Sequence, residues 1–436
     1  MKKLRSEAVN LTKIVYGGQS LGQLEDGKKI FVWGALPGET AQVEVMKAKR
    51  NYAEGIATNI ITTSANRVEP KDPESFLSTS PWQIMSYDYE NKLKQELIVE
   101  QFKQHGVSIN LDDYTSPEEP YFYRNKVEFT FWWERTHPDD EKNQEGELHL
   151  AFYKRGTHTK QPVEGTSLAN PVLNVAALKI RDYLRTQKIQ ARDLKSLLLR
   201  SNHKNEVVAE LYVKEKDLKI SWPHEDFGIS GFSVHFSNPK SPTTVKSKTL
   251  FSSGSNQLTD SILGKEYTYA ADGFFQVNLS MYESALKIMG KYIDAKKPIL
   301  DFYSGVGSIG LSLADKNQEL TMIEIDERCV KEAKANAKVI KPEAQIVLSS
   351  SESAIEQIDR EATIILDPPR AGLHQKVIDQ ILSVEPKTLV YLSCNPATQA
   401  RDMAQLSQKY KIKYAHGFNF FPRTPHIENL IILELM

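Results

Sequence analysis

The feature that most constrains the fold is an alternation of short apolar segments with helical patterns in the last third of the chain. Segments 298–302, 363–366 and 388–392 are apolar runs of strand length, whereas 327–337 has the pattern of a helix. This alternation predicts a mostly parallel sheet with helices on both faces. Ligands of such folds bind beyond the carboxyl ends of the strands, and the distinctive polar residues of this region follow strands.

The loop after the first of these strands, residues 301–310, contains a Gly-x-Gly-x-x-Gly pattern that begins at Gly305. Such glycines let a ligand approach the backbone, and a carboxylate at the end of the next strand, Glu324, is suited to ribose hydroxyls. Nicotinamide enzymes and S-adenosylmethionine enzymes share this pattern. Asp301 favours the second class, because its carboxylate would attract a cationic methionine moiety and repel a pyrophosphate. Strand–helix packing alone is the alternative.

Two further strand ends carry side chains suited to catalysis. Asp367 is followed by two prolines, which stiffen the loop and remove backbone donors, so its carboxylate is expected to be held at the strand tip. Loops of this kind line the target-base pocket in methyltransferases, and a simple turn is the alternative. Cys394 lies directly beyond the strand 388–392, where a thiol can act as a nucleophile. A buried, inert cysteine is the competing interpretation.

Glu428 lies between two apolar stretches with His426 beside it, which makes it a candidate base in a partly dry pocket. A surface carboxylate is the alternative. The second of the two cysteines, Cys329, falls within a predicted helix and is expected to be structural. Two cysteines cannot build a disulfide framework, and no Cys-x-x-Cys pair occurs, so we expect a cytoplasmic protein.

Composition sets the class of the protein. With 436 residues, 40% of them hydrophobic and 25% charged, the chain is expected to form several soluble globular domains. No apolar run is long enough to span a membrane, and the N-terminal segment lacks the apolar core of a signal peptide, so no membrane partner is expected. Because the net charge is -1, any nucleic-acid surface must be a local patch.

Three regions are predicted, with boundaries at 1–70, 71–270 and 271–436. Regularly spaced short strands and the hairpin signal Asp26-Gly27 predict a small barrel of the OB type in the first region. A basic cluster follows one of its strands and suits either phosphate contacts or protection of a strand edge; its members are Lys47, Lys49 and Arg50.

The central region is predicted to be α+β. Residues 89–104 have apolar side chains at helical spacing, and Gly106 lies just beyond them, which predicts a helix. We expect this helix, at about 89–105, to pack on the third region. The stretch rich in serine and lysine from Ser237 to Ser255 is predicted to be a loop.

Together these motifs resemble the RNA uracil-C5-methyltransferase family, specifically its bacterial ribosomal-RNA branch with an N-terminal TRAM domain. The resemblance is carried by Phe274-Phe275-Gln276-Val277-Asn278, Asp301-x-Tyr303-x-Gly305-x-Gly307, Glu324-Ile325-Asp326, Asp367-Pro368-Pro369-Arg370, Ser393-Cys394-Asn395-Pro396 and Phe421-Pro422-x-Thr424-x-His426-x-Glu428. It implies a multidomain fold: a TRAM-like β-barrel of the OB type, a central α+β domain and a C-terminal α/β Rossmann-like class I methyltransferase domain.

The resemblance also implies a role for each motif residue. Cys394 is similar to the nucleophile that attacks C6 of uracil, and Glu428 to the base that removes the C5 proton. Since a thiolate is required, we expect a depressed cysteine pKa. The residues implied to bind S-adenosyl-L-methionine, or to lie beside it, are Gln276, Tyr303, Glu324, Asp367, Asp301 and Gly305. The residues implied to contact the substrate are Phe274, Asp367 and Arg370.

One departure from the family concerns metal. The ribosomal-RNA branch often carries four cysteines for an iron-sulfur cluster, whereas Leu77–Gln83 occupies the expected cysteine region here. We therefore expect no cluster and no other metal site. The implied partner is RNA, with 23S ribosomal RNA favoured and transfer RNA as the alternative, and the expected state is a monomer. A nicotinamide oxidoreductase and a non-catalytic RNA-binding protein are the competing functions.

Overall fold

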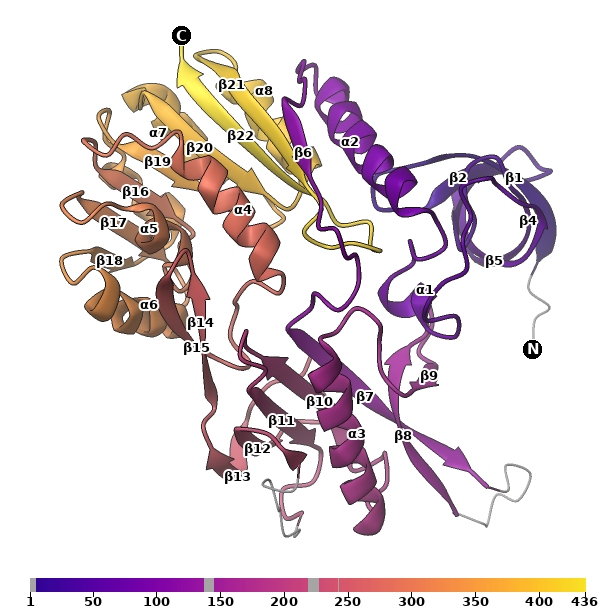
Figure 1. Ribbon diagram of the computed structural model, residues 1–436. Coiled ribbons are helices and arrows are strands. Elements are labelled where there is room, and N and C mark those ends of the chain that lie inside the picture. Colours follow the sequence, from indigo (N-terminus) through magenta and orange to yellow (C-terminus); the bar gives the residue numbers. More distant parts are fainter. Residues whose placement is uncertain (1–4, 137–144, 219–226, 242) are drawn as a thin grey trace. The chain divides into compact units, whose positions relative to one another are not determined.

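The structure of the protein is a computed structural model that describes residues 5–136, 145–218, 227–241 and 243–436 (Figure 1). Its contacts define two compact units. The first comprises Met1–Ser86, Glu119–Leu258 and Ala270–Asp272, and the second comprises Tyr87–Glu118, Thr259–Tyr269 and Gly273–Met436. The predicted boundaries of three regions stay a prediction. Among the described helices, none has the length and apolar character needed to cross a membrane.

The first unit begins with a closed five-stranded barrel, as the spacing of short strands predicted. Its strands are β1 (Ser6–Ile14), β2 (Ser20–Gln23), β3 (Lys29–Trp33), β4 (Thr40–Ala48) and β5 (Tyr52–Thr62), in the order β1-β2-β3-β5-β4 (Figure 1). Gly27 connects β2 to β3 at φ 83, a conformation that glycine adopts without steric penalty. In the basic cluster, Lys47 pairs with Glu54 at 3.5 Å.

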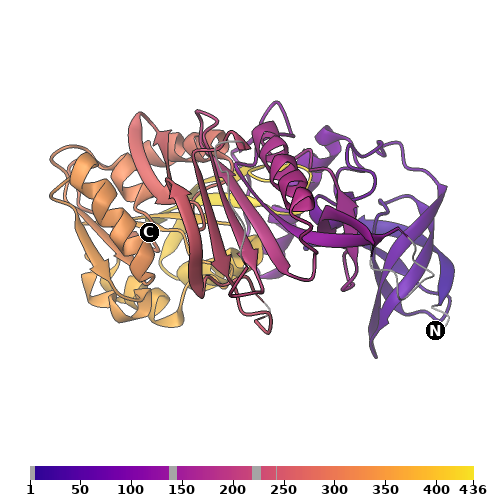
Figure 2. The same cartoon turned by 90° about the horizontal axis from the view of Figure 1, so that it is seen from below.

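The rest of the first unit is a seven-stranded sheet in the order β13-β12-β11-β10-β7-β8-β9. Its elements are β7 (Lys126–Arg135), β8 (Gly146–Tyr153), β9 (Lys160–Val163), α3 (Pro171–Thr186), β10 (Leu194–Ser201), β11 (Val207–Val213), β12 (Gly231–Phe236) and β13 (Lys248–Gly254), and a short helix α1 (Phe76–Thr79) precedes them. The helix α3 lies along one face of this sheet, and the apolar side chains between them form one core (Figures 1 and 2).

The strand β13 corrects the prediction of a loop from Ser237 to Ser255. It pairs antiparallel with β12 at the edge of the sheet, and the Ser252 and Ser233 hydroxyls lie 3.0 Å apart. Its residues Lys248–Gly254 are mostly half-buried or exposed, so the segment lacks the apolar run that marks a buried strand. Backbone pairing with β12 makes it a strand, and Leu250 and Phe251 pack against the core of the sheet.

The second unit is built on an eight-stranded sheet in the order β18-β17-β16-β19-β20-β22-β21-β6. Its strands are β6 (Asp113–Thr115), β16 (Ile299–Phe302), β17 (Leu320–Glu324), β18 (Gln345–Leu348), β19 (Thr363–Leu366), β20 (Thr388–Ser393), β21 (Tyr410–Phe418) and β22 (Glu428–Leu435). The strands from β18 to β20 are parallel, whereas β22 is antiparallel to both of its neighbours.

The helices of the second unit form two groups. Their bounds are α2 (Tyr87–Gln104), α4 (Leu279–Gly290), α5 (Ser308–Leu313), α6 (Glu327–Ile340), α7 (Gln375–Val384) and α8 (Pro396–Leu406). The helix α5 contacts α4 and α6, and α8 contacts α7 and α2. A hairpin of β14 (Gln257–Ile262) and β15 (Lys265–Ala270) precedes α4, and two short 3₁₀ turns, Ser351–Ser353 and Ile355–Gln357, follow β18.

A buried ion pair anchors α2 to the segment that leads into β22. The Glu90 carboxylate and the Lys94 ammonium lie 3.0 Å apart, and both side chains are fully buried. Lys94 also donates to Asn419 Oδ1 at 2.6 Å and to the Phe421 carbonyl at 3.1 Å. Glu90 accepts the backbone N–H of Arg423 at 3.0 Å. The two side chains on α2 therefore hold the chain just before Glu428.

This anchor predicts a large loss of stability for Lys94→Met. The substitution removes the cation at 3.0 Å from the buried Glu90 carboxylate and leaves only the more distant Arg423 Nη1 at 3.7 Å. Breaking a buried pair in this way typically costs about 3–5 kcal/mol. Lys92→Met is the matched control, because Lys92 pairs with Glu96 at 3.8 Å on the exposed side of the same helix. The control should lose at most about 1 kcal/mol of unfolding free energy. Equal losses in urea unfolding monitored by circular dichroism would contradict the anchoring role.

Candidate functional site

The predicted site residues of the parallel strands lie at one edge of the sheet. Asp301 is on β16, Glu324 ends β17, Asp367 follows β19 and Cys394 follows β20. Since β16 and β19 are neighbours although β17 and β18 lie between them in sequence, this is the point where the strand order reverses. Ligands of doubly wound sheets bind at such a point.

Strand register brings Cys394 and Glu428 together. The antiparallel pairing of β20 with β22 puts Ser393 opposite Asn429, so the next residues outward are Cys394 on one strand and Glu428 on the other. Gln399 fixes this arrangement, because its amide donates to the Asn429 carbonyl at 3.2 Å and accepts from the Asn429 side chain at 2.7 Å. The thiol and the carboxyl group therefore come from adjacent strands.

The loop after β19 is fastened to the loop that carries the cysteine. Asn395 Nδ2 donates to the Arg370 carbonyl at 2.7 Å, and Thr398 Oγ1 donates to the same oxygen at 3.2 Å. Asn395 also caps α8, since its side chain accepts the backbone N–H of Ala397 at 3.2 Å. These bonds bring the segment Asp367-Pro368-Pro369-Arg370 beside Cys394.

The electrostatics of this cluster correct the expectation of a depressed cysteine pKa. Burial raises the pKa of the half-buried Cys394 thiol to about 12, and the acidic groups Glu428 and Asp367 add to the rise, while Arg370 opposes it. The expectation took account of the need for a thiolate but not of the two acids that the fold brings beside it. At neutral pH the resting site therefore holds a thiol.

The two acids of the cluster are themselves shifted. Burial raises the pKa of Asp367 to about 7. Burial, and then the charge of Asp367, raises the pKa of Glu428 well above its usual range, while Arg370 lowers it. Only 6% of Glu428 is exposed, so the candidate base lies in the interior and not on the surface. Such shifts are typical of functional sites.

The glycine loop after β16 is shaped by Glu324. The Glu324 carboxylate accepts the backbone N–H of Gly305 at 2.9 Å, of Ile325 at 2.8 Å and of Asp326 at 2.7 Å. Gly305 has φ 56, and a Cβ added there would meet no atom within 4 Å, so the loop borders open space. Tyr303 has φ 64, and its hydroxyl accepts a hydrogen bond from Ser351 at 2.9 Å.

The surroundings of the Asp301 carboxyl group indicate whether this loop fits S-adenosylmethionine. The side chain is fully buried, and its Oδ2 accepts the Gly310 N–H at 2.9 Å. Within the described residues, Oδ1 is buried without a hydrogen-bond partner. Burial raises the pKa of Asp301 to about 8, and the nearby Asp367 and Glu324 add to this. Asp301 is therefore mostly uncharged at neutral pH, and a nearby cationic ligand would favour its carboxylate form and compensate the unpaired oxygen.

The motif before α4 supplies the remaining predicted residues. Phe274 is 67% exposed, and Gln276 is half-buried. Between them, Phe275 stacks on Tyr269 with ring centroids 3.9 Å apart. Asn278 caps α4, and its Nδ2 donates to the Phe420 carbonyl at 3.0 Å. This bond fastens the motif to the segment that leads to Glu428.

Sequence reasoning missed several supporting residues. They are Glu90, Lys94, Ser351 and Gln399, which position other site residues through hydrogen bonds or ion pairs. Glu90 and Lys94 lie four residues apart on a helix whose apolar face was predicted, and this spacing was the available signal. The others are single polar residues without a pattern.

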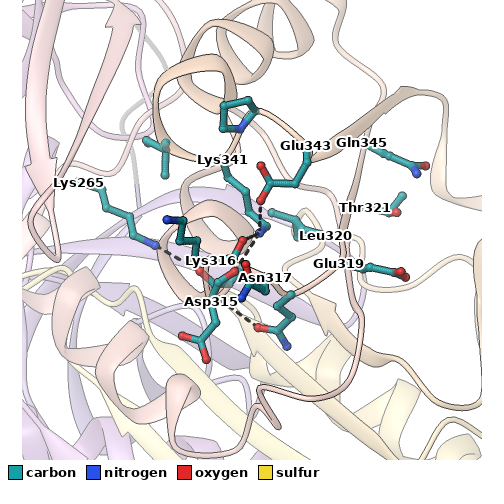
Figure 3. Close-up of a pocket in the computed structure, with 14 residues that line it drawn as sticks. Lys265, Asp315, Lys316, Asn317, Glu319, Leu320, Thr321, Lys341, Glu343 and Gln345 are labelled. Carbon is teal, nitrogen blue, oxygen red and sulfur yellow. Dashed lines mark hydrogen bonds and ion pairs between the residues drawn. The ribbon is translucent and has the colours of Figure 1, made fainter.

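A cavity of about 740 Å³ lies at the other end of the strands and is not the candidate site (Figure 3). It is lined by residues at the amino ends of β17 and β18, including Leu320 and Gln345. Lys265 donates to the Leu311 carbonyl at 2.7 Å, and Lys341 donates to the Asp315 carbonyl at 2.9 Å. Both lysines thus satisfy backbone carbonyls and not an open site.

Comparison with known proteins gives consistent matches. The tRNA (uracil-5-)-methyltransferase family matches residues 86–436, and the TRAM domain matches residues 8–58. An uncharacterized RNA methyltransferase of Fusobacterium nucleatum is 27% identical, with 98% of this chain and 95% of the relative covered. One of Lactobacillus johnsonii is 28% identical, with 100% of this chain and 99% of the relative covered.

Among solved structures, the chain resembles the Pyrococcus abyssi tRNA (uracil-54, C5)-methyltransferase in complex with S-adenosyl-L-homocysteine. The TM-score is 0.77 at 20% identity, with 98% of this chain and 100% of that chain covered. The likeness is one of fold. It confirms the predicted combination of an N-terminal barrel with α/β methyltransferase architecture.

The raised pKa of Asp301 predicts how stability depends on pH. The unfolded carboxyl group releases its proton near its ordinary value of 3.8, whereas the folded one keeps it up to about 8. The free energy of unfolding should therefore fall as pH rises through this window, by about 1.4 kcal/mol per pH unit from this group. Asp301→Asn should flatten urea-unfolding free energies measured between about pH 5 and about pH 8.

Asp379→Asn is the control for this measurement, because Asp379 is an exposed carboxylate on α7. It should leave the pH dependence unchanged. If Asp301→Asn and the control both follow the unsubstituted protein across the window, the buried acid does not hold its proton in the folded state.

Proposed function

The chain belongs to the tRNA (uracil-5-)-methyltransferase family and methylates C5 of uracil in RNA with S-adenosylmethionine, and we propose that Cys394 and Glu428 perform the covalent steps. One observation carries the proposal. Cys394 and Glu428 occupy adjacent positions on paired strands, and the charges of Glu428, Asp367 and Arg370 all act on the Cys394 thiol.

Cys394 makes the uracil ring reactive. Its thiolate adds to C6, and the electron pair of the C5=C6 bond moves toward the O4 carbonyl, which leaves C5 nucleophilic. Because the resting group is a thiol with a pKa of about 12, a proton must leave it before attack. Arg370 is the cation that lowers this pKa, so it favours the thiolate. Bound S-adenosylmethionine supplies an electrophilic methyl group.

Glu428 completes the reaction. Once C5 carries both the methyl group and its original hydrogen, the Glu428 carboxylate takes that proton. The electron pair of the C5–H bond restores the C5=C6 bond, and the bond between C6 and the Cys394 sulfur breaks to release the thiolate. Burial raises the pKa of Glu428, which makes its carboxylate a stronger base than an exposed one.

Asp367 is proposed to hold the target base and to lie beside the cofactor. With a pKa of about 7, it can donate to a uracil carbonyl as an acid or accept from N3–H as a carboxylate. Phe274, with its exposed ring, is suited to pack on the base. For the base to reach Cys394 it must leave its stack in the RNA.

The residues proposed to hold S-adenosylmethionine surround the glycine loop. Asp301 would face its cationic methionine moiety, and the backbone at Gly305 would allow close approach. The Glu324 carboxylate accepts hydrogen bonds from three backbone N–H groups, so ribose hydroxyls would bind at its remaining lone-pair positions. Gln276 and Tyr303 complete the proposed set.

Cys394→Ala should abolish 5-methyluridine formation, because no other group adds to C6. Glu428→Gln should instead stall after methyl transfer and accumulate a covalent RNA–protein adduct, visible as a slower band on a denaturing gel. Cys329→Ala is the control, since Cys329 lies in α6 and has no proposed role. Normal turnover in Cys394→Ala, or Glu428→Gln turnover without an adduct, would remove the respective role.

The proposed substrate is 23S ribosomal RNA, as the motifs and TRAM domain favour, with transfer RNA as the alternative. The Pyrococcus abyssi enzyme acts on tRNA and matches this chain over 98% of its length, barrel included, so the architecture suits either RNA. A strain lacking the gene should lose 5-methyluridine from 23S ribosomal RNA, measured by nuclease digestion and mass spectrometry of separated RNAs. Loss confined to transfer RNA would establish the alternative.

A further inference from the structure

Phe122 combines backbone strain with exposure. It lies just before β7 in the first unit, has φ 58, and is 44% exposed. A bulky residue with positive φ is a genuine outlier and costs on the order of 1–3 kcal/mol unless its surroundings hold it. Here the Phe122 N–H donates to the Ser167 carbonyl at 2.9 Å. Burial of the ring does not explain the strain, since much of the ring remains in solvent.

A lysine accompanies the exposed ring. Lys71 Nζ lies 4.0 Å from the centre of the Tyr121 ring and 4.9 Å from that of Phe122. Lys71 is exposed, whereas Tyr121 is buried with 9% exposure. We call Lys71, Tyr121 and Phe122 the aromatic–lysine platform. The ammonium group of Lys71 lies over both rings, and Phe122 is the ring of the pair that is exposed.

The platform is held in place by Asp72. The Asp72 carboxylate accepts the Ser167 N–H at 3.0 Å, the Ser167 hydroxyl at 2.9 Å and the Thr166 hydroxyl at 3.2 Å. Ser167 in turn holds the backbone of Phe122. The position of Lys71 is therefore linked to that of Phe122 through a fixed set of hydrogen bonds, which is what a preorganised binding surface requires.

Similar strain occurs at the candidate catalytic site. Tyr303 has φ 64 and Arg423 has φ 64, and both lie in segments of that site. The other described non-glycine residues with positive φ, apart from Phe122, lie outside that site: Lys188, Asn205, Leu263 and Glu385. Strained residues of this kind concentrate where ligands bind. Phe122 shares the geometry but belongs to the other compact unit, the one that contains the barrel.

We propose that Phe122 stacks on an unpaired nucleobase of the substrate RNA, a nucleotide other than the target uridine, and that Lys71 neutralises its phosphate. The proposal rests on RNA methylation as the activity of the chain. Aromatic faces bind unpaired bases of any sequence, and nearby cations bind the backbone between them. The platform also has the Glu119 carboxylate beside it, which accepts the Tyr121 N–H at 3.0 Å. RNA is therefore favoured over a protein partner because the chain is an RNA methyltransferase, and Lys71 supplies the cation for a phosphate.

Binding of a fluorescein-labelled single-stranded RNA of mixed sequence tests this in the full chain carrying Cys394→Ala, which prevents covalent capture. Phe122→Ala should raise Kd about fivefold or more, because one stacked base is lost. Phe122→Trp should keep the affinity. Phe122→Gly relieves the backbone strain but removes the ring, so it should bind as weakly as Phe122→Ala while unfolding no more easily than the parent.

The contribution of the Lys71 charge is measured by the salt dependence of RNA binding. Lys71→Ala should lower the slope of log Kd against log salt by about 0.7, the value for one phosphate of a single strand. Trp132→Ala is the control, because Trp132 is an aromatic residue of the same unit with 39% exposure. Parent-like binding by Phe122→Ala and Phe122→Gly overturns the proposal, as does an equal loss in Trp132→Ala or with a duplex RNA probe.

Formation of 5-methyluridine by the wild-type chain on RNA from the deletion strain is measured in parallel. If the wild-type chain forms none, the proposed function fails whatever Phe122 does. If it forms 5-methyluridine and the Phe122 variants bind RNA as the parent does, only the platform fails.

Discussion

The proposed chemistry of this protein depends on the antiparallel pairing of β22 with β20. In the parallel part of the sheet, every strand ends at the same edge, so residues that follow strands gather there. The strand β22 runs the other way, and its first residue reaches that edge. A carboxyl group at the start of one strand thus meets a thiol beyond the end of its neighbour, with Ser393 opposite Asn429. A slip of one residue would turn Glu428 to the other face of the sheet.

Burial disfavours the charged forms of the thiol and of three acids in this site. The thiol of Cys394 and the acids Asp301, Asp367 and Glu428 all have raised pKa values, and in each case burial is the largest cause. The Cys394 thiolate and the Glu428 carboxylate that the proposed reaction needs must therefore form by loss of a proton after the ligands bind. Arg370 opposes the rise at both Cys394 and Glu428, so one exposed cation acts on both groups of the proposed covalent steps.

Much of the fold could be predicted because apolar runs report buried strands directly. The strand 363–366 was predicted with the bounds that β19 has, and Leu93 and Leu97 were among the apolar side chains expected on the buried face of α2. Hydrophobic periodicity identifies only apolar residues of a buried face, so it did not identify the buried charged residues Glu90 and Lys94. It also missed β13, which has no apolar run.

The candidate site, like the fold, could be predicted only in part. The motifs supplied the candidate residues, whose roles stay a prediction, and the structure brings Cys394, Glu428, Asp367 and Arg370 together at one sheet edge. The direction of the thiol pKa shift was wrong, because that shift depends on neighbours that three separate segments contribute. The pKa of this thiol depends on charges that are distant in sequence, so a local sequence pattern cannot predict it.

The place of β22 in the sheet also has a consequence for biosynthesis. It follows every other strand of this sheet in the sequence, yet it lies between β20 and β21. Until the ribosome has made it, β20 and β21 each present an unpaired edge, the kind of surface that promotes aggregation and chaperone binding. The candidate base, Glu428, arrives with that same strand. With the proposed roles of Cys394 and Glu428, a nascent chain cannot modify RNA before β22 has joined the sheet. Catalytic competence and protection of these strand edges are then acquired together.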